Sequence, residues 1–205
     1  MKPLIAIVDY NAGNLRSVQK ALELVGARTK ITSDATDLAT ARGVVFPGQG
    51  ANDPAMRQLK TRSLVDPIKD VIHSGKPFLG VCLGLQLLLE SSEEGIVPAL
   101  GIMQGTVKRL PQGLKVPHIG WNNVSFKRQH PVFEGVPDNS YFYFVHSYYA
   151  DPESRGMVTG TTTYGVEFCS AAARGSMAAV QFHPEKSGKV GLKIYENFVR
   201  IVAES

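Results

Sequence analysis

The sequence predicts an α/β protein with a mostly parallel central sheet flanked by helices and an antiparallel β extension in the second half. Two observations carry this prediction. In the first half, short apolar segments of strand character alternate with segments of helical periodicity, an order typical of a parallel sheet covered by helices on both faces. From about residue 106 to residue 181 the chain changes to strands and turns, which indicates an antiparallel extension of the same sheet.

The first half begins with an apolar strand at residues 4–8. A helix is expected next, because apolar residues recur there at helical spacing, namely Leu15, Val18, Ala21, Leu22 and Val25. Gly26 suits the end of this helix, since glycine readily adopts the left-handed conformation after a last turn. Three shorter elements follow, a strand at 28–31, a helix at 35–41 and a strand at 44–46.

A further helix is expected at residues 67–74. Asp66 would be its N-cap, Pro67 suits the first helical position and Gly75 suits the end. The strand at 78–81 then completes the alternating half. Ligands bind such sheets at the carboxyl ends of the strands, so the functional residues are expected at that edge.

The second half is expected to contain strands at residues 106–110, 141–145, 158–163, 166–171 and 177–182. The last of these returns to the main sheet and closes the extension. The chain then ends in a helix at about 190–203 with one apolar face, formed by Ile194, Tyr195, Phe198, Val199 and Val202. No repeat, low-complexity tract or linker interrupts the sequence, so we expect a single domain over residues 1–205.

Composition argues against several classes of function. A chain of 205 residues with 43% hydrophobic and 20% charged residues suits a globular domain, and no segment approaches the roughly 20 apolar residues of a membrane span. The start lacks the features of a signal peptide, and two cysteines do not indicate a disulfide framework. The net charge of +4 is scattered, and the five histidines lack zinc-site spacing. We therefore expect a cytoplasmic protein with no cofactor, no metal, and no nucleic-acid or membrane partner.

A G-x-C-x-G pattern at residues 80–84 joins the strand at 78–81 to an apolar, helix-forming run at 85–90. This is the cysteine form of the nucleophile elbow, in which glycines let the backbone pass close to a strained nucleophile. At such a corner Cys82 would lie at a helix N-terminus, where unpaired N–H groups favour the thiolate. The alternative is a buried cysteine in an apolar strand, which is how we interpret the second cysteine, Cys169.

A second polar group follows the strand at 177–182, in the order His183, Pro184, Glu185. Proline disfavours helix in the residue before it, so His183 should be extended. In an extended chain residues two apart face the same side, so the Glu185 carboxylate can orient the His183 imidazole. With Cys82 these side chains would form a nucleophile, a base and an orienting carboxylate, although a lone His-Pro-Glu is more often an ordinary turn.

The third segment is a P-G-x-G loop at residues 47–50, directly after the strand at 44–46. In the elbow architecture one oxyanion donor is the N–H of the residue after the nucleophile, here Leu83, and another comes from an earlier strand–helix loop. Backbone N–H groups around Gln49 and Gly50 are placed to supply this second donor. Alone, such a loop is weak evidence, because most are plain turns.

With the elbow, the His-Pro-Glu segment and the P-G-x-G loop, the chain resembles the class I, triad-type glutamine amidotransferases. Within this family it is most similar to the glutaminase subunits of imidazole glycerol phosphate synthases, which are enzymes of histidine biosynthesis. The finer resemblance is carried by four segments, at residues 9–18, 117–122, 143–148 and 183–187. The matching segments span nearly the whole chain. The sequence departs from the family at Gln49, where relatives more often have a small apolar residue such as valine.

The resemblance implies hydrolysis of glutamine to glutamate and ammonia through a cysteine thioester. The residues that match the family's triad are Cys82, His183 and Glu185. Those that match its glutamine-binding surface are Gly50, Gln86, His146, Ser147 and Tyr148. For Gln86 a helix-surface residue, and for His146 a satisfied histidine on a strand edge, are the plain structural alternatives.

The resemblance also implies a partner subunit. The chain has no phosphate-binding, adenylation or metal motif with which to use the ammonia itself. In the resembled enzymes the partner is a (β/α)₈-barrel cyclase, and the complex makes imidazole glycerol phosphate and an aminoimidazole carboxamide ribotide. The residues that match the family's partner surface are Asn11, Asn14, Trp121 and Lys186.

Two other functions stay open at this point. The chain could be the glutaminase subunit of another synthase, such as anthranilate or pyridoxal phosphate synthase. It could also be a catalytically silent binding module on the same fold. A nucleic-acid-binding module is the weakest alternative, because the basic residues do not cluster.

Overall fold

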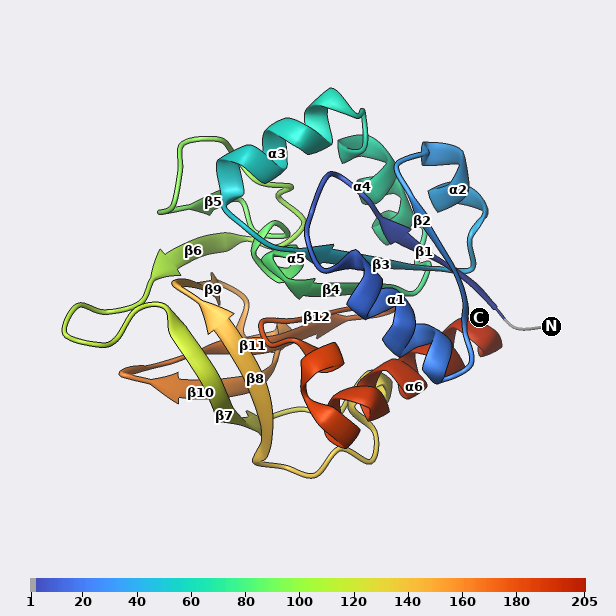
Figure 1. The fold of residues 1–205 in the computed structure, drawn as a ribbon. Coiled ribbons are helices and arrows are strands. Elements are labelled where there is room, and N and C mark those ends of the chain that lie inside the picture. Colours follow the sequence, from blue (N-terminus) through green and yellow to red (C-terminus); the bar gives the residue numbers. More distant parts are fainter. Residues whose placement is uncertain (1–2) are drawn as a thin grey trace.

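The computed structural model describes residues 3–205 and contains one large sheet that continues from a parallel into an antiparallel part (Figure 1). The strands of the first half are β1 (Leu4–Val8), β2 (Arg28–Thr32), β3 (Gly43–Gly48) and β4 (Phe78–Cys82). Those of the second half are β5 (Ser91–Ser92), β6 (Gly105–Arg109), β7 (His118–Phe126), β8 (Ser140–His146), β9 (Tyr148–Pro152), β10 (Val158–Tyr164), β11 (Val166–Arg174) and β12 (Met177–Val180).

The strand order is β2-β1-β3-β4-β12-β11-β10-β7-β8, with β9, β6 and β5 as a side branch next to β11. Pairing is parallel from β2 to β12 and antiparallel from β12 to β8. The predicted α/β fold with an antiparallel extension is therefore confirmed. As expected, the segment around 177–182 closes the extension, because β12 joins β11 on one side and β4 on the other.

Helices cover both faces of the parallel part (Figure 1). One face carries α2 (Ala35–Thr40), α3 (Asn52–Thr61) and α4 (Val65–His73), and the other carries α1 (Leu15–Leu24) and α6 (Gly188–Glu204). Side chains along β1 alternate between the two: Ile5 and Ile7 pack with the α1 and α6 residues, and Ala6 and Val8 with the opposite layer. Burial on both faces explains why β1, β3 and β4 are almost wholly apolar, whereas the edge strand β2 is polar and more exposed.

Two sequence expectations about the helices are wrong. The helix α3 was not predicted, because only Ala55, Met56 and Leu59 give it an apolar side within a polar stretch. The helix α4 begins at Val65 rather than after Asp66, and within the described chain no side chain caps its N-terminus. Asp66 lies in the first turn, where its negative charge still favours the helix dipole.

The helix after the elbow is also shorter than expected. α5 spans only Leu83–Gln86, although the apolar run continues to residue 90. The carbonyl groups of Leu87, Leu88 and Leu89 instead accept backbone N–H groups of residues 100–103. The P-G-x-G segment differs too, because Pro47 and Gly48 extend β3 and the loop starts only at Gln49. Within residues 3–205, no helix has the length and apolar character that a membrane crossing needs.

The register of the central strands gathers their carboxyl ends. Gly48 at the end of β3 pairs with Cys82 at the end of β4, and Val180 at the end of β12 pairs with Val81. The segments that follow β3, β4 and β12 therefore start at one edge of the sheet. These are the oxyanion loop, the elbow and the His-Pro-Glu segment of the sequence analysis.

Candidate active site

Cys82 ends β4 at the turn into α5, and its backbone has φ 57° and ψ −111°. This conformation lies outside the regions that side-chain-bearing residues prefer, and such strain costs on the order of 1–3 kcal/mol. A strained residue at a strand-to-helix corner is the geometry that the G-x-C-x-G pattern predicts. The side chain is mostly buried and lines the pocket described below.

The glycines around the elbow are required by close contacts. A side chain at Gly84 would bring its Cβ to 2.0 Å from the backbone oxygen of Phe46. At Gly48 a Cβ would lie 2.3 Å from the Tyr10 hydroxyl and 2.8 Å from Leu83 Cβ. The strands β3 and β4 and the helix α5 therefore approach more closely than side chains permit, which holds the loop after β3 beside the nucleophile.

Replacing Gly84 by alanine should destabilise the fold. The added methyl group meets rigid backbone at Phe46, so β3 or α5 must shift, and overpacking of this kind costs about 1–3 kcal/mol or more. Urea denaturation should show a lower midpoint with an unchanged slope. The control is Gly156→Ala, where the nearest atom to the new Cβ is 3.6 Å away. Equal midpoints for the two variants would contradict the close contact.

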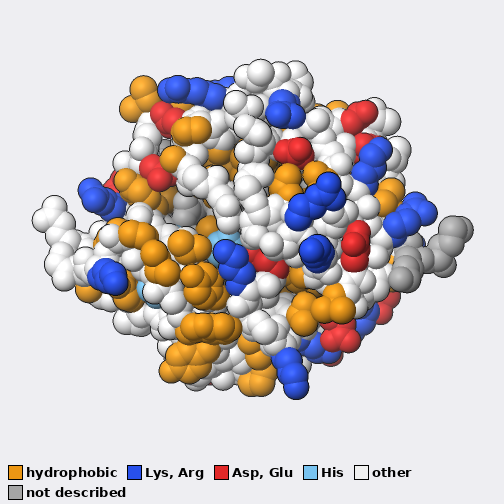
Figure 2. All heavy atoms as spheres, in the orientation of Figure 1, with side chains coloured by type: hydrophobic (Ala, Val, Ile, Leu, Met, Phe, Trp, Pro, Cys, Tyr) orange, Lys and Arg blue, Asp and Glu red, His pale blue; other side chains and the backbone are white. Residues whose placement is uncertain are grey.

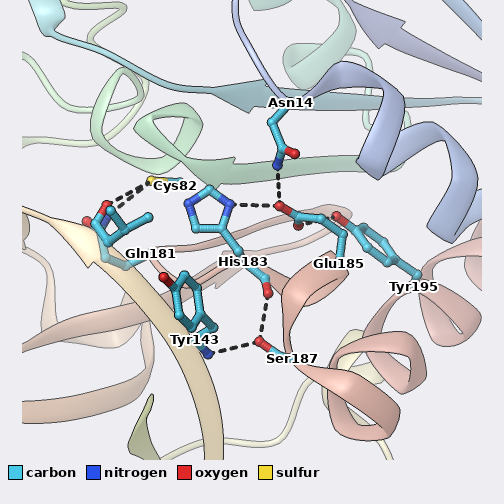
Figure 3. A network of polar contacts seen from close by, with 9 residues as sticks. Asn14, Cys82, Tyr143, Gln181, His183, Glu185, Ser187 and Tyr195 are labelled. Carbon is cyan, nitrogen blue, oxygen red and sulfur yellow. Dashed lines mark hydrogen bonds and ion pairs between the residues drawn. The ribbon is translucent and has the colours of Figure 1, made fainter. Parts of the chain in front are cut away.

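His183 and Glu185 follow β12 and are brought together by a 3₁₀ turn. His183 is extended, with φ −103° and ψ 97°, as the following proline requires. The turn η3 (Pro184–Lys186) then places Glu185 Oε1 at 2.8 Å from His183 Nδ1. The expected pairing is present, but a turn rather than an extended segment produces it. The other ring nitrogen, Nε2, has no hydrogen-bond partner among residues 3–205 and is turned toward Cys82 (Figure 3).

The Glu185 carboxylate is buried and receives donors from three parts of the chain (Figure 3). His183 and the Asn14 side-chain amide donate to Oε1, and the Tyr195 hydroxyl on α6 donates to Oε2 at 3.1 Å. Burial raises the pKa of Glu185, but the donors His183 and Asn14 outweigh it and hold the pKa below its usual range. A charged carboxylate fixes the orientation of the imidazole. The sequence analysis did not foresee these roles for Asn14 and Tyr195.

The segment that carries the pair is tied to the antiparallel part of the sheet. The backbone N–H of His183 donates to the Tyr143 carbonyl at 2.9 Å, and the Tyr143 N–H donates to the Ser187 hydroxyl at 3.0 Å. That hydroxyl donates in turn to the His183 carbonyl at 2.6 Å. The position of the imidazole is thus fixed from β8 as well as from β12.

The electrostatics favour an ion pair between Cys82 and His183. Burial lowers the pKa of His183, but the Cys82 sulfur and the Glu185 carboxylate raise it, and the net value is about 10. The imidazole is therefore protonated at neutral pH, and its free nitrogen faces the Cys82 sulfur. A thiolate with an imidazolium is a nucleophile together with a proton donor for a leaving group.

His183 should accordingly titrate near pH 10, and at lower pH in Cys82→Ala, because that change removes the sulfur anion. NMR of the His183 ring protons across a pH series measures this, with Cys169→Ala as the control that should not move the midpoint. Since the folded value lies above the ordinary 6.5, protonated His183 stabilises the fold fully below about pH 6.5, and this contribution is lost as the pH rises toward 10. A midpoint that Cys82→Ala leaves unchanged would contradict the ion pair.

A cavity of about 390 Å³ opens beside Cys82 at the carboxyl edge of the sheet. Its lining residues are Gln49, Gly50, Cys82, Leu83, Gln86, Glu94, Pro117, Val145, His146, Ser147, Tyr148, His183 and Lys186. The structure thus brings together every predicted triad, oxyanion and substrate-binding residue except Glu185, which lies behind His183. A larger groove of about 670 Å³ around residues 126–136 contains none of them.

Two predicted substrate residues already have partners inside the protein. The Gln86 amide nitrogen donates to the Tyr148 carbonyl at 2.8 Å and to Gln181 Oε1 at 2.9 Å, which leaves its oxygen for a ligand. His146 Nδ1 lies 2.9 Å from the same carbonyl and must donate to it, so Nε2 accepts from His118 at 3.0 Å. Burial lowers the pKa of His146 to about 3, so it stays neutral beside His183.

Glu94 is a pocket residue that the sequence analysis missed. Its carboxylate accepts the Asn52 backbone N–H at 2.8 Å, and burial raises its pKa. No local pattern distinguishes it from the neighbouring surface acid Glu93. Lys186 lines the same cavity. The pocket therefore has one acidic and one basic residue in its lining, and this pairing complements a zwitterion.

The oxyanion segment lies across the pocket from His183. Leu83 is the first residue of α5, so its N–H has no partner within the helix. Gln49 and Gly50 are exposed, and Gly50 has φ +95°, which lets the adjoining peptide groups take orientations closed to other residues. The side-chain oxygen of Gln49 packs against Gly13, in the loop between β1 and α1.

Of the four residues predicted for a partner surface, Lys186 lines this pocket and Asn14 contacts the triad residue Glu185. Asn11 is exposed, whereas the Asn14 amide is turned inward to Glu185. Trp121 is 56% exposed on β7 and packs edge-on against Tyr143, over whose ring Lys186 lies at 5.6 Å. Exposed Ile119 and Tyr141 extend this apolar area, and Figure 2 shows hydrophobic side chains gathered over β7 and β8.

Cys169 is placed as the sequence analysis expects. It lies in β11, is almost fully buried, and its sulfur contacts the Ala171 carbonyl at 3.4 Å. Burial raises the pKa of this thiol to about 12. It is therefore an inert residue of the core, in contrast to Cys82.

Two comparisons of the sequence with known proteins point to one family. The model of the family Glutamine amidotransferase class-I matches residues 6–202. The chain is 51% identical to the imidazole glycerol phosphate synthase subunit HisH of Moorella thermoacetica over 98% of this chain and 96% of that protein. It is 46% identical to the subunit of the same name from Dehalococcoides mccartyi (strain CBDB1), over 97% of each.

Solved structures share the fold at low sequence identity. A putative GMP synthase protein from Thermoplasma acidophilum superposes with a TM-score of 0.75 at 23% identity and covers 100% of this chain and 96% of that chain. A chain in the structure of PurLQS from Thermotoga maritima gives a TM-score of 0.77 at 17% identity, over 98% of this chain and 99% of that one. These similarities concern the fold alone.

Proposed function

The chain belongs to the class I glutamine amidotransferase family, and on this basis we propose that it hydrolyses glutamine as the glutaminase subunit of an imidazole glycerol phosphate synthase in histidine biosynthesis. The observation that carries the proposal is that Cys82 and His183 line one pocket and that the Glu185 carboxylate holds the other side of the His183 ring. The near full-length similarity to HisH subunits supports the choice of synthase over the anthranilate and pyridoxal phosphate alternatives.

The reaction follows from the positions of these groups. The Cys82 thiolate attacks the side-chain amide carbon of glutamine, and the N–H groups of Leu83 and of the Gln49–Gly50 region bind the resulting oxyanion. Each such donor contributes about 10²–10³ in rate. The His183 imidazolium gives its proton to the nitrogen, the C–N bond breaks, and ammonia leaves a thioester on Cys82. Neutral His183 then takes a proton from the water that attacks the thioester, which releases glutamate and the thiolate.

The polar groups of the pocket suit the amino-acid end of glutamine. Glu94 faces the cavity with a carboxylate that can pair with an α-ammonium group, and the free oxygen of Gln86 can accept from the same group. Gly50, Ser147 and Tyr148 contribute backbone to the walls, and His146 holds Tyr148 in place. We assign recognition of the substrate to this set.

The partner in this proposal is a (β/α)₈-barrel cyclase in the cytoplasm, which uses the ammonia to make imidazole glycerol phosphate and an aminoimidazole carboxamide ribotide. The surface formed by Asn11, Trp121 and Lys186 is where we place it, because exposed apolar side chains there adjoin the pocket mouth. Asn14 lies beneath this surface and contacts Glu185, so partner docking can reach the triad through one side chain.

The test is a glutaminase assay of the chain alone and with a barrel cyclase and its nucleotide ligand. The complex should turn over glutamine much faster than the isolated chain, because the peptides next to Gly50 can reorient cheaply and the partner selects the productive orientation. A barrel enzyme without cyclase activity is the matched control partner. Full glutaminase rate without any partner would contradict the gating, and no glutaminase activity in any mixture would contradict the function itself.

A further inference from the structure

The side chain of Gln181 lies beside the proposed nucleophile, although it belongs neither to the triad nor to the oxyanion donors or the substrate-binding residues. Gln181 follows β12 directly and is fully buried. Its Nε2 lies 3.7 Å from Cys82 Sγ, within the range of an N–H···S hydrogen bond (Figure 3). The chain thus buries a polar amide at the sulfur, where an apolar side chain would cost nothing in desolvation.

The orientation of this amide is fixed by its neighbours. The Tyr148 carbonyl can only accept, so the group that Gln86 presents to it at 2.8 Å is the amide nitrogen. The same nitrogen lies 2.9 Å from the Gln181 side chain, which must therefore offer its oxygen. The Gln181 nitrogen is left facing the sulfur. The Tyr148 carbonyl therefore fixes the orientation of the Gln86 amide, and the Gln86 amide fixes that of Gln181. As a result, Cys82 faces the N–H donor of Gln181 and not its oxygen.

The groups around the Cys82 sulfur interact differently with its thiol and thiolate forms. The Val145 carbonyl, at 4.0 Å, can interact only with an S–H group. The Gln181 amide and protonated His183 can only donate, so both favour the anion. The helix α5 has four residues, which is too short for a helix dipole to supply this stabilisation by itself.

We propose that Gln181 is a hydrogen-bond donor that holds Cys82 as a thiolate, and that Gln86 is the positioning residue that keeps this donor directed at the sulfur. The proposal rests on the proposed function only in taking Cys82 as the nucleophile. Its test needs no glutamine, so it can fail or succeed separately.

The measurement is the rate of Cys82 alkylation by iodoacetamide from about pH 5 to about pH 9, read by mass spectrometry in a Cys169→Ser background. Gln181→Met keeps the volume and removes the donor. We expect alkylation at neutral pH to slow about tenfold and the midpoint of the pH profile to rise by about one unit. Gln181→Glu, which places an acceptor at the sulfur, should slow it further.

The positioning role of Gln86 has its own readout. Gln86→Met should slow alkylation like Gln181→Met, and the double variant should be no slower than either single variant, because both act through one hydrogen bond. A role of Gln86 in glutamine binding alone predicts a higher KM and normal alkylation. The control is Asn197→Leu, which removes a buried amide that donates to Val132 and Glu134 carbonyls far from the sulfur.

Two results would overturn the proposal. One is a wild-type pH profile in both Gln181→Met and Gln86→Met. The other is an equal slowing in Asn197→Leu, which would assign the effect to general loosening of the fold. If Gln181→Met fails to fold, the alkylation profile of Gln86→Met decides alone, since that change leaves the side chains of β12 and of Gln181 themselves unaltered.

Discussion

Cys82→Ala should abolish synthesis from glutamine in a complex with the cyclase while leaving synthesis from added ammonium salts near normal. Cys82 supplies the attacking sulfur, and removing a nucleophile of this kind lowers the rate by at least about 10⁴-fold. Cyclisation of the nucleotide substrate takes place on the partner in this proposal, so it does not need the sulfur. The ratio of the two rates therefore separates ammonia production from ammonia use.

The two rates are best compared at high pH, where more of the added ammonia is unprotonated. Cys169→Ala is the matched control, because it removes the other cysteine, which is buried and does not line the pocket, and should change neither rate. Equal loss of both rates in Cys82→Ala would assign Cys82 a structural or interface role. The proposal of a dedicated ammonia generator would then be wrong.

Glu185→Gln should have the second largest effect, a fall in glutaminase rate of about 10³–10⁴-fold. The magnitude follows serine proteases, where the equivalent Asp→Asn change leaves the histidine in the wrong tautomer. Here the carboxylate accepts from His183, Asn14 and Tyr195 at once, and an amide has only one oxygen to offer. In the variant, one of the three donors therefore faces the side-chain N–H group of the new glutamine. The negative charge of Glu185, which stabilises protonated His183, is also lost.

The steady-state rate and the His183 titration measure this together. In Glu185→Gln the glutaminase rate and the pKa of His183 should both fall. Tyr195→Phe removes a single donor from the same carboxylate and should lower the rate about tenfold or less. Tyr195→Phe also controls for disturbance of α6. A rate in Glu185→Gln no lower than in Tyr195→Phe would show that the carboxylate does not orient the base.

Much of the fold follows from local pattern because the parallel strands are buried on both faces. The elements at residues 4–8 and 78–82 were predictable from short apolar runs, and the first and last helices from one apolar face each. The polar helix α3 was not, since its burial depends on neighbours distant in sequence. For the same reason the run after residue 86 leaves the helix, as its carbonyls find partners at residues 100–103.

In the candidate site too, some residues could be predicted from local sequence and others could not. Cys82 ends a strand, His183 and the loop at Gln49 each follow one, and parallel strands bring their carboxyl ends to one edge, so their meeting was predictable. Glu94, Gln181 and the inward turn of Asn14 were not. Each is a common polar residue whose importance comes from a contact made across the fold, and no spacing in the sequence records such a contact.

The backbone at Cys82 makes the loss of this activity structurally cheap. Only glycine takes up φ 57° and ψ −111° without strain, and the relief of about 1–3 kcal/mol offsets the roughly 0.5–1 kcal/mol that glycine loses in a more flexible unfolded chain. A change of one base in the codon, from cysteine to glycine, therefore removes the proposed nucleophile at little cost in stability. Proteins that descend from such a chain can serve as regulatory subunits without catalytic activity, and a glycine at the position of Cys82 would identify them.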